Sequence, residues 1–423
     1  MISRVLAADV GRHVGERIRI AGWVHRRREL KSVTFVLVRD RTGIVQVVGV
    51  GNLPDGVTEE TPVEVVGSVV DSSRAPGGCE VVDAEFTLLS ERAVPGPFDL
   101  YRPTVTATLP TVLDNASVAL RHPLLRARFE VASASVAGFR SVLDGLGFVE
   151  THTPKIVSSA TESGATVFGI DYFGRRAYLA QSPQFYKQAL VGVFERVYEV
   201  GPVFRAEPHD TARHLAQYTS LDAELGFVTD HRDVMEVLRE VVAGMAGAAA
   251  RLVPDAVPMV PERIPEIHFQ DAQEWLARET DDDPRGEPDL APAHERALAD
   301  WAWRTHGSEF LFVTGYPMAK RPFYTHPDPE RPGYSNSFDL LFRGVELVTG
   351  GQRLHRHGDY LAALRDSGAD PGTYRDYLDV FSHGMPPHGG FALGLERWTA
   401  RLLGLGNVRW AALFPRDLHR LTP

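Results

Sequence analysis

Residues 197–227 form the stretch that most restricts how this chain can fold, because two strand-like runs there carry acidic and basic side chains. The runs flank a polar loop that is too long and too charged for a tight hairpin turn. Arg205 and Glu207 are two positions apart, so they point to one face of the first run, and Asp222 and Glu224 do the same on the second. Such a face is not an ordinary core face, because unpaired buried charges are costly. These residues alone allow two interpretations, a ladder of structural ion pairs or a binding site.

Length and composition restrict the class of protein further. With 423 residues, 43% of them hydrophobic, the chain is expected to form two or three soluble globular domains. No apolar run is long enough to span a membrane and the start lacks a signal-peptide core, so no membrane partner is expected. The single cysteine, Cys79, excludes an intramolecular disulfide framework and fits a reducing, cytoplasmic compartment. The net charge of −10 argues against general nucleic-acid binding and leaves local basic patches as contact sites.

Residues 1–90 alternate β-rich runs with turns, which predicts a small closed barrel, the OB-fold. A basic cluster at residues 25–31 precedes Phe35, Arg39 and Gln46. An aromatic platform beside cationic and amide side chains suits an unstacked nucleic-acid base. The alternative is that Phe35 belongs to the core and the arginines are solvated. The expected strands are Arg17–His25, Thr34–Asp40, Ile44–Val48, Val63–Val70 and Cys79–Leu89.

The rest of the chain divides into a linker and a larger domain. Residues 91–120 carry four prolines, which is typical of a linker or hinge. In residues 121–423, strand-like runs alternate with helical stretches, as expected for a mixed sheet flanked by helices. Residues 260–307 carry few motifs and are interpreted as an insertion. The chain has no Walker loop and no Gly-x-Gly-x-x-Gly after a strand, so neither common nucleotide-binding fold is indicated.

Several motifs, in the same order along the chain, resemble those of the class II aminoacyl-tRNA synthetases. Residues 204–207, Phe-Arg-Ala-Glu, followed by Arg213 and His214, resemble motif 2. Residues 389–397, Gly-Gly-Phe-Ala-Leu-Gly-Leu-Glu-Arg, resemble motif 3, and Pro154 is similar to the proline that ends motif 1. The ordered set is far more specific than any one motif. Further segments resemble aspartyl-tRNA synthetases of the archaeal type, namely 159–164, 181–188, 350–355, 384–389, 413–416 and 420–423.

The resemblance implies an α+β protein in which an N-terminal OB-fold barrel precedes a class II catalytic domain with a mixed, mainly antiparallel sheet. It implies an aspartate–tRNA ligase, which activates L-aspartate with ATP to an adenylate and transfers it to tRNA, and a homodimer built on residues 124–154. Arginine suits this chemistry because its planar fork binds phosphate and carboxylate. By resemblance, the catalytic residues are Arg205, Glu207 and Arg397, the ATP-binding residues are Arg205, Arg213, His214, Tyr218, Glu346 and Arg397, and the Mg²⁺ ligands are Glu346 and Thr349.

The side chain of aspartate adds a second carboxylate, so its pocket needs fixed positive charge. By resemblance, Lys187 and Arg353 supply this charge, while Asp222, Gln184 and Glu162 hold the α-ammonium. An asparagine pocket would not need the lysine, because an amide offers no anion to pair with it, and this argues against an asparagine–tRNA ligase. The barrel argues against a tRNA-independent asparagine synthetase. The retained motif arginines argue against a paralogue that acts only as a binding or regulatory module.

The resemblance also predicts how tRNA is recognised. Phe35, Arg39 and Gln46 fall where the family's barrel grips the anticodon. At the positions of His25 and Pro76, strict enzymes of this type tend to carry Trp and Lys, and relaxed enzymes tend to carry His and Pro. Proline has no N–H, so it cannot donate a hydrogen bond that distinguishes C from U. Both tRNA(Asp) and tRNA(Asn) are therefore expected as substrates, and the alternative is an enzyme restricted to tRNA(Asp).

Overall fold

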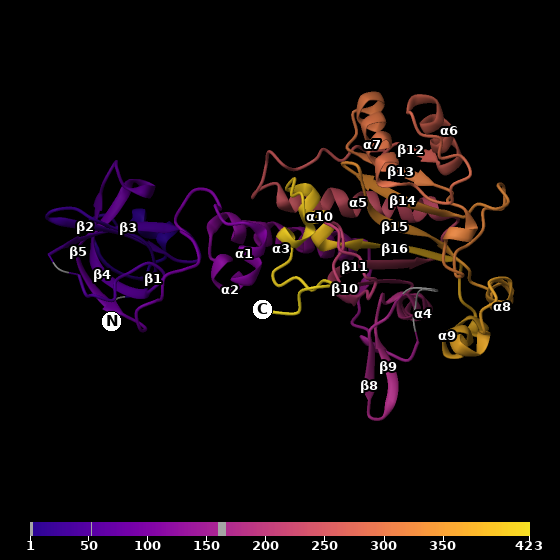
Figure 1. The fold of residues 1–423 in the computed structure, drawn as a ribbon, viewed down its shortest axis with the longest axis horizontal. Helices are drawn as coiled ribbons and strands as arrows, with labels where there is room; N and C mark the ends of the chain where they lie inside the picture. Colours follow the sequence, from indigo (N-terminus) through magenta and orange to yellow (C-terminus); the bar gives the residue numbers. More distant parts are fainter. Residues whose placement is uncertain (1–2, 52, 160–165) are drawn as a thin grey trace. The chain divides into compact units, whose positions relative to one another are not determined.

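The computed structural model describes residues 3–51, 53–159 and 166–423, and the chain divides into two compact units. The first unit extends to Arg126, and the second comprises Ala127–Thr422 (Figure 1). Residues 91–120, the predicted linker, group with the first unit and include the short helices α1 (Leu109–Asp114) and α2 (Ala116–Ala119). Among the described helices, none is long and apolar enough to cross a membrane.

The first unit contains a closed barrel of five strands in the order β1-β2-β3-β5-β4, which confirms the predicted OB-fold. Side chains alternate between the interior and the outer face, and the interior is mainly valine and isoleucine, with Val36, Val47 and Val65 completely buried. These β-branched side chains pack well on a pleated surface. The strands are β1 (Arg17–Glu29), β2 (Val33–Arg39), β3 (Ile44–Val50), β4 (Pro62–Asp71) and β5 (Cys79–Leu88).

The second unit is built on an eight-stranded sheet with the order β12-β13-β14-β15-β16-β11-β10-β6. The β10–β6 and β12–β13 pairs are parallel and the others are antiparallel, so the prediction of a mixed, mainly antiparallel sheet is confirmed. The strands are β6 (Val149–Glu150), β10 (Arg196–Phe204), β11 (Gln217–Gly226), β12 (Glu266–His268), β13 (Phe310–Thr314), β14 (Ser337–Phe342), β15 (Val345–Arg353) and β16 (His388–Gly394).

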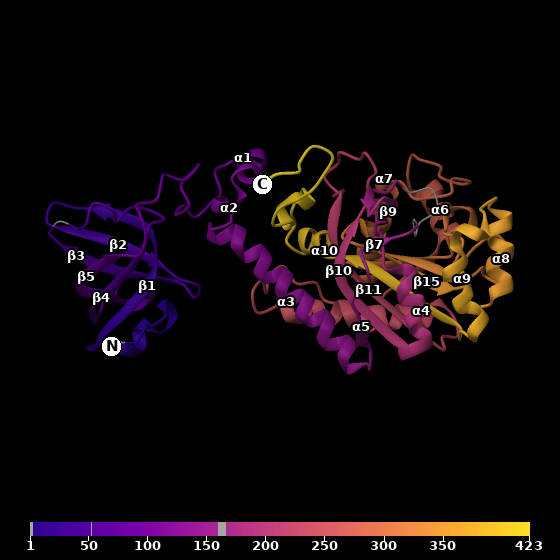
Figure 2. The ribbon, with the colours of Figure 1, turned by 90° about the horizontal axis from the view of Figure 1, so that it is seen from below.

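Helices cover this sheet (Figure 2). Helices α3 (Pro123–Gly145) and α5 (His231–Ala249) share a hydrophobic core with the sheet. Gly138 and Gly244 allow these helices to approach closely, because a Cβ on Gly138 would lie only 2.5 Å from the Gly244 carbonyl oxygen. The other helices are α4 (Gln184–Phe194), α6 (Phe269–Glu279), α7 (Pro292–His306), α8 (His357–Asp366), α9 (Arg375–Val380) and α10 (Leu395–Leu402), and a small sheet contains β7 (Ile156–Val157), β8 (Gly169–Tyr172) and β9 (Arg175–Leu179).

Residues 260–307, predicted to be an insertion, take part in the main sheet. Their strand β12 pairs with β13, and α6 and α7 pack against β13 through a second hydrophobic core that includes Phe269, Leu298 and Val313. Residues 260–307 are therefore continuous with the eight-stranded sheet.

The two charged runs of the sequence are the adjacent antiparallel strands β10 and β11. One detail differs from the expectation, because β10 ends at Phe204 and leaves Arg205 and Glu207 in the loop that follows. Asp222 and Glu224 do lie on β11, where they are buried. Asp222 and Glu224 are thus held in the interior, whereas Arg205 and Glu207 lie at the start of the loop between β10 and β11.

Candidate active site

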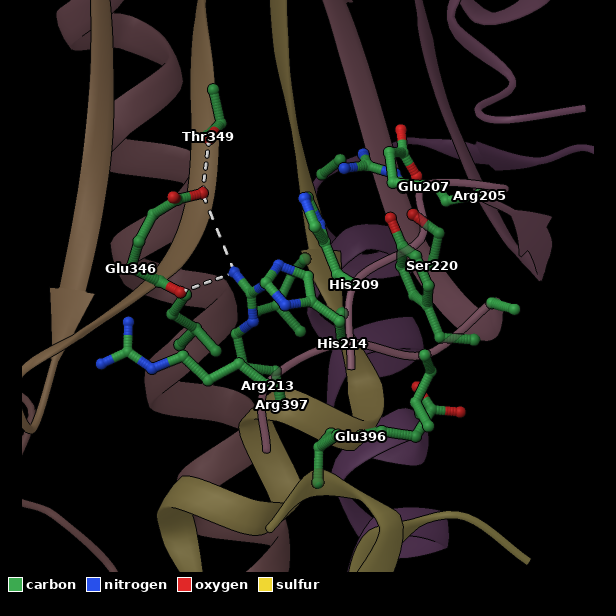
Figure 3. A pocket seen from close by; sticks show the side chains of 18 of the residues that line it. Arg205, Glu207, His209, Arg213, His214, Ser220, Glu346, Thr349, Glu396 and Arg397 are labelled. Atoms are coloured by element: carbon green, nitrogen blue, oxygen red, sulfur yellow. Dashed lines mark hydrogen bonds and ion pairs between the residues drawn. The ribbon is translucent and has the colours of Figure 1, made fainter. Parts of the chain in front are cut away.

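A cavity of about 340 Å³ opens beside β11, β15, β16, α10 and the loop after β10 (Figure 3). Three separate segments of the chain, 205–220, 346–349 and 396–397, supply its polar side chains, and the sheet order brings them together because β15, β16 and β11 are neighbours. Every residue that the sequence predicted for catalysis, ATP or Mg²⁺ lines this one cavity, namely Arg205, Glu207, Arg213, His214, Tyr218, Glu346, Thr349 and Arg397.

Positive charge dominates one part of this cavity. The Arg205 guanidinium lies 5.7 Å from the centre of the Tyr218 ring. Nη1 of Arg397 donates a hydrogen bond to the Glu346 carbonyl oxygen at 2.8 Å and lies 3.9 Å from that residue's carboxylate. Burial, and then the charge of Arg397, lowers the pKa of His214 below its ordinary value. Arginine guanidinium groups in such a setting are well suited to bind phosphate and carboxylate oxygens.

Glu346 and Thr349 provide a pair of oxygen ligands on β15. The Thr349 hydroxyl donates a hydrogen bond to Oε1 of Glu346 at 3.0 Å. Burial alone would raise the pKa of Glu346, but Arg397 and the Thr349 hydroxyl outweigh it and hold the pKa below its ordinary value. An ionised carboxylate beside a hydroxyl fits Mg²⁺, which prefers hard oxygen ligands. Within the described ranges no cluster of three or more His, Cys, Asp or Glu residues could hold a metal.

Glu295 on α7 is a cavity neighbour that the sequence analysis did not identify. Its Oε2 lies 3.2 Å from Nη1 of Arg213 and accepts the Glu346 backbone N–H at 3.3 Å. Burial raises the pKa of Glu295, while the charge of Arg213 acts in the opposite direction. The residue belongs to the region interpreted as an insertion, and nothing in its sequence surroundings indicates that α7 would reach β15.

Four of the residues predicted to bind aspartate, Gln184, Lys187, Asp222 and Arg353, are buried next to this cavity. Nζ of Lys187 donates hydrogen bonds to Oδ1 of Asp222 and to the Phe391 carbonyl oxygen, both at 3.1 Å, and forms an ion pair with Oε2 of Glu224 at 3.2 Å. Nε of Arg353 lies 3.0 Å from Oε1 of Glu224. The four charges, named here the charge quartet, come from Lys187, Asp222, Glu224 and Arg353 and sum to zero.

Glu224 is the centre of the charge quartet and was not among the predicted site residues. Burial alone would raise its pKa, but Arg353 and Lys187 outweigh burial and hold the pKa below the ordinary value. The backbone at Gly390 approaches it so closely that a Cβ there would lie 2.0 Å from the Glu224 carboxylate. Lys187 already donates hydrogen bonds to Asp222 and to a backbone carbonyl oxygen and is paired with Glu224, so the carboxylate of a ligand would have to compete with Asp222 or Glu224 for its charge.

The charge quartet connects to the cavity through Ser220, whose hydroxyl donates to Oδ2 of Asp222 at 2.5 Å and which also lines the cavity. Gln184 lies one turn before Lys187 on α4 and is buried. Glu162, the remaining predicted aspartate ligand, lies outside the residues that the structure describes.

On the barrel, two of the predicted anticodon residues share one face. Phe35 pairs with Val48 and Leu37 pairs with Gln46 across β2 and β3, so Phe35 and Gln46 are half-buried on the same outer face. Gln46 donates a hydrogen bond to Glu80 at 2.6 Å. The aromatic ring of Phe35 and the amide of Gln46 therefore lie on one face of the barrel, as a base-binding surface would require.

Arg39 and His25, two further residues predicted to contact the anticodon, are buried in this structure. The Arg39 side chain is buried, with Nη2 3.0 Å from Oε2 of Glu60 and Nη1 3.2 Å from the Arg121 carbonyl oxygen. Burial, and then the charge of Arg39, lowers the pKa of His25 to about 4. The pairing register shifts between Val24 and Arg26, and His25 at the shift lies in the interior.

Pro76, the last of the predicted anticodon residues, is exposed. It begins the short 3-10 helix Pro76–Gly78, in which Gly77 and Gly78 have positive φ angles of 76° and 77°. Glycine adopts such angles without strain, so the turn itself explains the Pro-Gly-Gly sequence.

The fold and the cavity define a class II aminoacyl-tRNA synthetase, and comparison with protein families agrees. Residues 109–418 match the family described as tRNA synthetases class II (D, K and N), and residues 18–89 match the OB-fold nucleic acid binding domain. The chain therefore belongs to the class II tRNA synthetase family, and it is an aminoacyl-tRNA ligase.

Individual relatives within this family are named for particular amino acids and tRNAs. The chain is 47% identical to the aspartate–tRNA(Asp/Asn) ligase of Thermus thermophilus over 99% of this chain and 100% of that protein. It is 37% identical to the aspartate–tRNA(Asp) ligase of Pyrococcus horikoshii over 97% of each chain. A solved structure of asparaginyl-tRNA synthetase from Pyrococcus horikoshii, complexed with asparaginyl-adenylate, has a TM-score of 0.91 and 31% identity and covers 100% of both chains.

Glu295→Gln should raise the KM for ATP by about 3- to 10-fold and leave the KM for the amino acid unchanged. The amide keeps the shape of the side chain but loses the charge that holds Arg213 in the cavity, a partly exposed interaction worth ~1 kcal/mol. Steady-state ATP–pyrophosphate exchange measures both constants. Asp300→Asn, an exposed change on the same helix, is the control and should have no effect. An unchanged KM for ATP in Glu295→Gln would show that the contact is incidental.

Proposed function

We propose that this protein is an aspartate–tRNA ligase that activates L-aspartate with ATP and transfers it to tRNA(Asp) and tRNA(Asn). The observation that carries the proposal is the charge quartet beside a cavity lined by Arg205 and Arg397. Two buried cations next to an arginine-rich cavity suit a substrate with two carboxylates. The names of the Thermus thermophilus relative and of several others support the same substrates.

In the first step, an oxygen of the aspartate α-carboxylate forms a bond to the α-phosphorus of ATP, and the bond to the β-phosphate oxygen breaks to release pyrophosphate. The two reactants are both anionic, so the protein's main task is to position them and neutralise their charge. Arg205 and Arg397 serve this role at the cavity wall. Mg²⁺ held by Glu346 and Thr349 would neutralise phosphate charge.

In the second step, a ribose hydroxyl at the 3′ end of the tRNA attacks the carbonyl carbon of the adenylate. The bond between that carbon and the phosphate oxygen breaks, and AMP leaves. The mixed anhydride supplies the free energy for the ester bond, so the protein needs no further activated group.

Aspartate is favoured over asparagine because of the balance of charge in the quartet. When the side-chain carboxylate of the substrate takes the place of Asp222 beside Lys187, the α-ammonium of the substrate would pair with Asp222, so the buried cation and the buried anion both stay compensated. A neutral amide in the same place would leave a buried cation with weaker compensation, which is costly. The proposed substrate therefore differs from that of the asparaginyl-tRNA synthetase whose solved structure is similar to this chain.

ATP–pyrophosphate exchange by the purified protein should depend on L-aspartate and not on L-asparagine. Arg205→Ala and Arg397→Ala should each reduce kcat/KM by about 10²–10³, because each removes charge at the place where the transition state develops it. Arg304→Ala, an exposed change on α7, is the control and should retain the wild-type rate. Exchange driven equally well by asparagine would overturn the aspartate assignment. Near-normal exchange by either cavity variant would show that arginine to be structural.

Relaxed tRNA specificity is supported by Pro76, which is exposed and has neither an N–H nor a side-chain donor to distinguish C from U. His25 adds no restriction, because it is buried and uncharged. Relatives of both kinds are known, since one is named for tRNA(Asp/Asn) and another for tRNA(Asp) alone.

The purified enzyme should charge tRNA(Asp) and tRNA(Asn) transcripts with kcat/KM values that differ by less than about 100-fold, the ~2.7 kcal/mol that one or two good base contacts provide. Pro76→Lys should increase the preference for tRNA(Asp), since it adds a donor at an exposed turn. Pyrophosphate exchange, which needs no tRNA, serves as the internal control and should not change. A wild-type preference for tRNA(Asp) above that limit would establish a discriminating enzyme.

We infer further that two copies of the chain form a homodimer through residues 124–154. Apolar side chains of this segment and of the C-terminal region are exposed, including Leu124, Val149, Leu413 and Phe414. Two-fold pairing is the commonest closed assembly and would cover them. Light scattering at working concentration should give the mass of two chains, and a monomer mass would refute the inference.

A further inference from the structure

Gln188, which follows Lys187 on α4, belongs to a cluster of buried hydrogen bonds. The cluster includes His388 on β16. Nδ1 of His388 lies 2.9 Å from the Pro386 carbonyl oxygen, which can only accept, so Nδ1 carries a proton. His388 is completely buried, and burial lowers its pKa to about 4, so the ring holds no second proton near neutral pH. Nε2 is therefore an acceptor, and its partner at 2.9 Å, the amide group of Gln188, must present N–H to it.

Tyr360 on α8 imposes the same direction on Gln188 independently. The Tyr360 hydroxyl donates its hydrogen to the Leu354 carbonyl oxygen at 2.8 Å. It must therefore accept from Gln188, whose Nε2 lies 3.0 Å away. Two separate groups thus require that the amide nitrogen of Gln188, and not its oxygen, faces His388 and Tyr360.

The direction of Gln188 determines the direction of Gln184, one turn earlier on α4. Because Nε2 of Gln188 faces His388 and Tyr360, its Oε1 faces the other way and accepts from Nε2 of Gln184 at 3.0 Å and from the Tyr377 hydroxyl at 2.8 Å. The amide nitrogen of Gln184 is thereby turned toward Gln188. Among the residues that the structure describes, no hydrogen bond to Oε1 of Gln184 is formed.

We propose that His388, Tyr360 and Gln188 form a polarity relay that fixes the Gln184 amide with its oxygen toward the α-ammonium of bound aspartate. The proposal rests on the proposed function, in which Gln184 is an ammonium ligand. An ammonium group only donates hydrogen bonds, so it binds an amide oxygen and is repelled by an amide NH₂. An amide that could rotate freely would present the wrong group for part of the time. The relay residues act through Gln184 and are positioning residues.

The relay has two independent starting points, and this leads to a specific test by a double-mutant cycle. Either His388 or Tyr360 alone is enough to set the direction of Gln188. His388→Leu and Tyr360→Phe should therefore each raise the KM for aspartate by less than about 3-fold, while the double variant should raise it by about 10-fold or more. The KM for ATP should stay the same in all three. Tyr374→Phe, which removes the hydroxyl of a ring that packs on Phe185 of α4 and makes no contact with Gln188, is the matched control and should behave as the wild type.

Succinate, which is aspartate without its amino group, separates the relay from general packing. As a competitive inhibitor of exchange, succinate uses only carboxylate contacts, because it has no ammonium group to bind the Gln184 oxygen. Its inhibition constant should therefore change by less than about twofold in every variant. If the double variant does not fold, Gln188→Met removes the same polarity in one step. It should raise the KM for aspartate by about 10-fold without weakening succinate.

Three results would overturn the relay. These are additive single and double effects, a parallel loss of succinate inhibition, or an unchanged KM for aspartate in both the folded double variant and Gln188→Met. Failure of the wild-type protein to use aspartate is a different outcome, because it would reject the proposed function itself. Thermal unfolding of each variant confirms that the compared proteins are folded.

Discussion

The catalytic sheet depends on one buried carboxylate, Glu224, which two cations share. Lys187 comes from α4, Arg353 from β15 and Glu224 from β11, so the ion pairs join three elements that are far apart in sequence. Removing one partner would leave an uncompensated buried charge, at a cost of about 3–5 kcal/mol. In the proposed function, the contacts that hold these elements together are also the contacts that a dicarboxylic substrate would use, so stability and specificity would depend on the same atoms.

Backbone groups of β16 complete this arrangement. The carbonyl oxygens of Phe391 and Gly390 accept hydrogen bonds from Lys187 and Arg353, and Gly390 leaves room for Glu224. The neighbouring strands β11 and β15 carry Tyr218, Glu346 and Thr349 of the cavity, while Arg205 and Arg213 lie in the loop after β10. Rigid elements hold reacting groups more closely to the required geometry than loops do.

Sequence patterns and the resemblance predicted the barrel, the mixed sheet and eight of the polar residues that line the cavity, because those features depend on local alternation and on short ordered motifs, but they missed His209, Ser220 and Glu396. They could not reveal Glu295, since its role depends on where α7 packs against β15. They also could not reveal that Arg39, assigned to the anticodon face by resemblance, is buried against Glu60, or that a register shift on β1 places His25 in the interior. Glu60, the buried ion-pair partner of Arg39, is distant from it in sequence, so no motif near Arg39 predicts that the two side chains meet.

The contact between Arg121 and the barrel has a consequence for how the first unit can be divided. Arg121 accepts from Arg39 through its carbonyl oxygen and donates to Glu60 through its guanidinium at 3.2 Å. The segment before α3 therefore supplies part of the barrel's internal charge balance and does not behave as a simple tether. A protease-resistant fragment would extend to about residue 126, where the first unit ends, and a fragment cut at residue 90 would lack the groups that neutralise and cover its own interior.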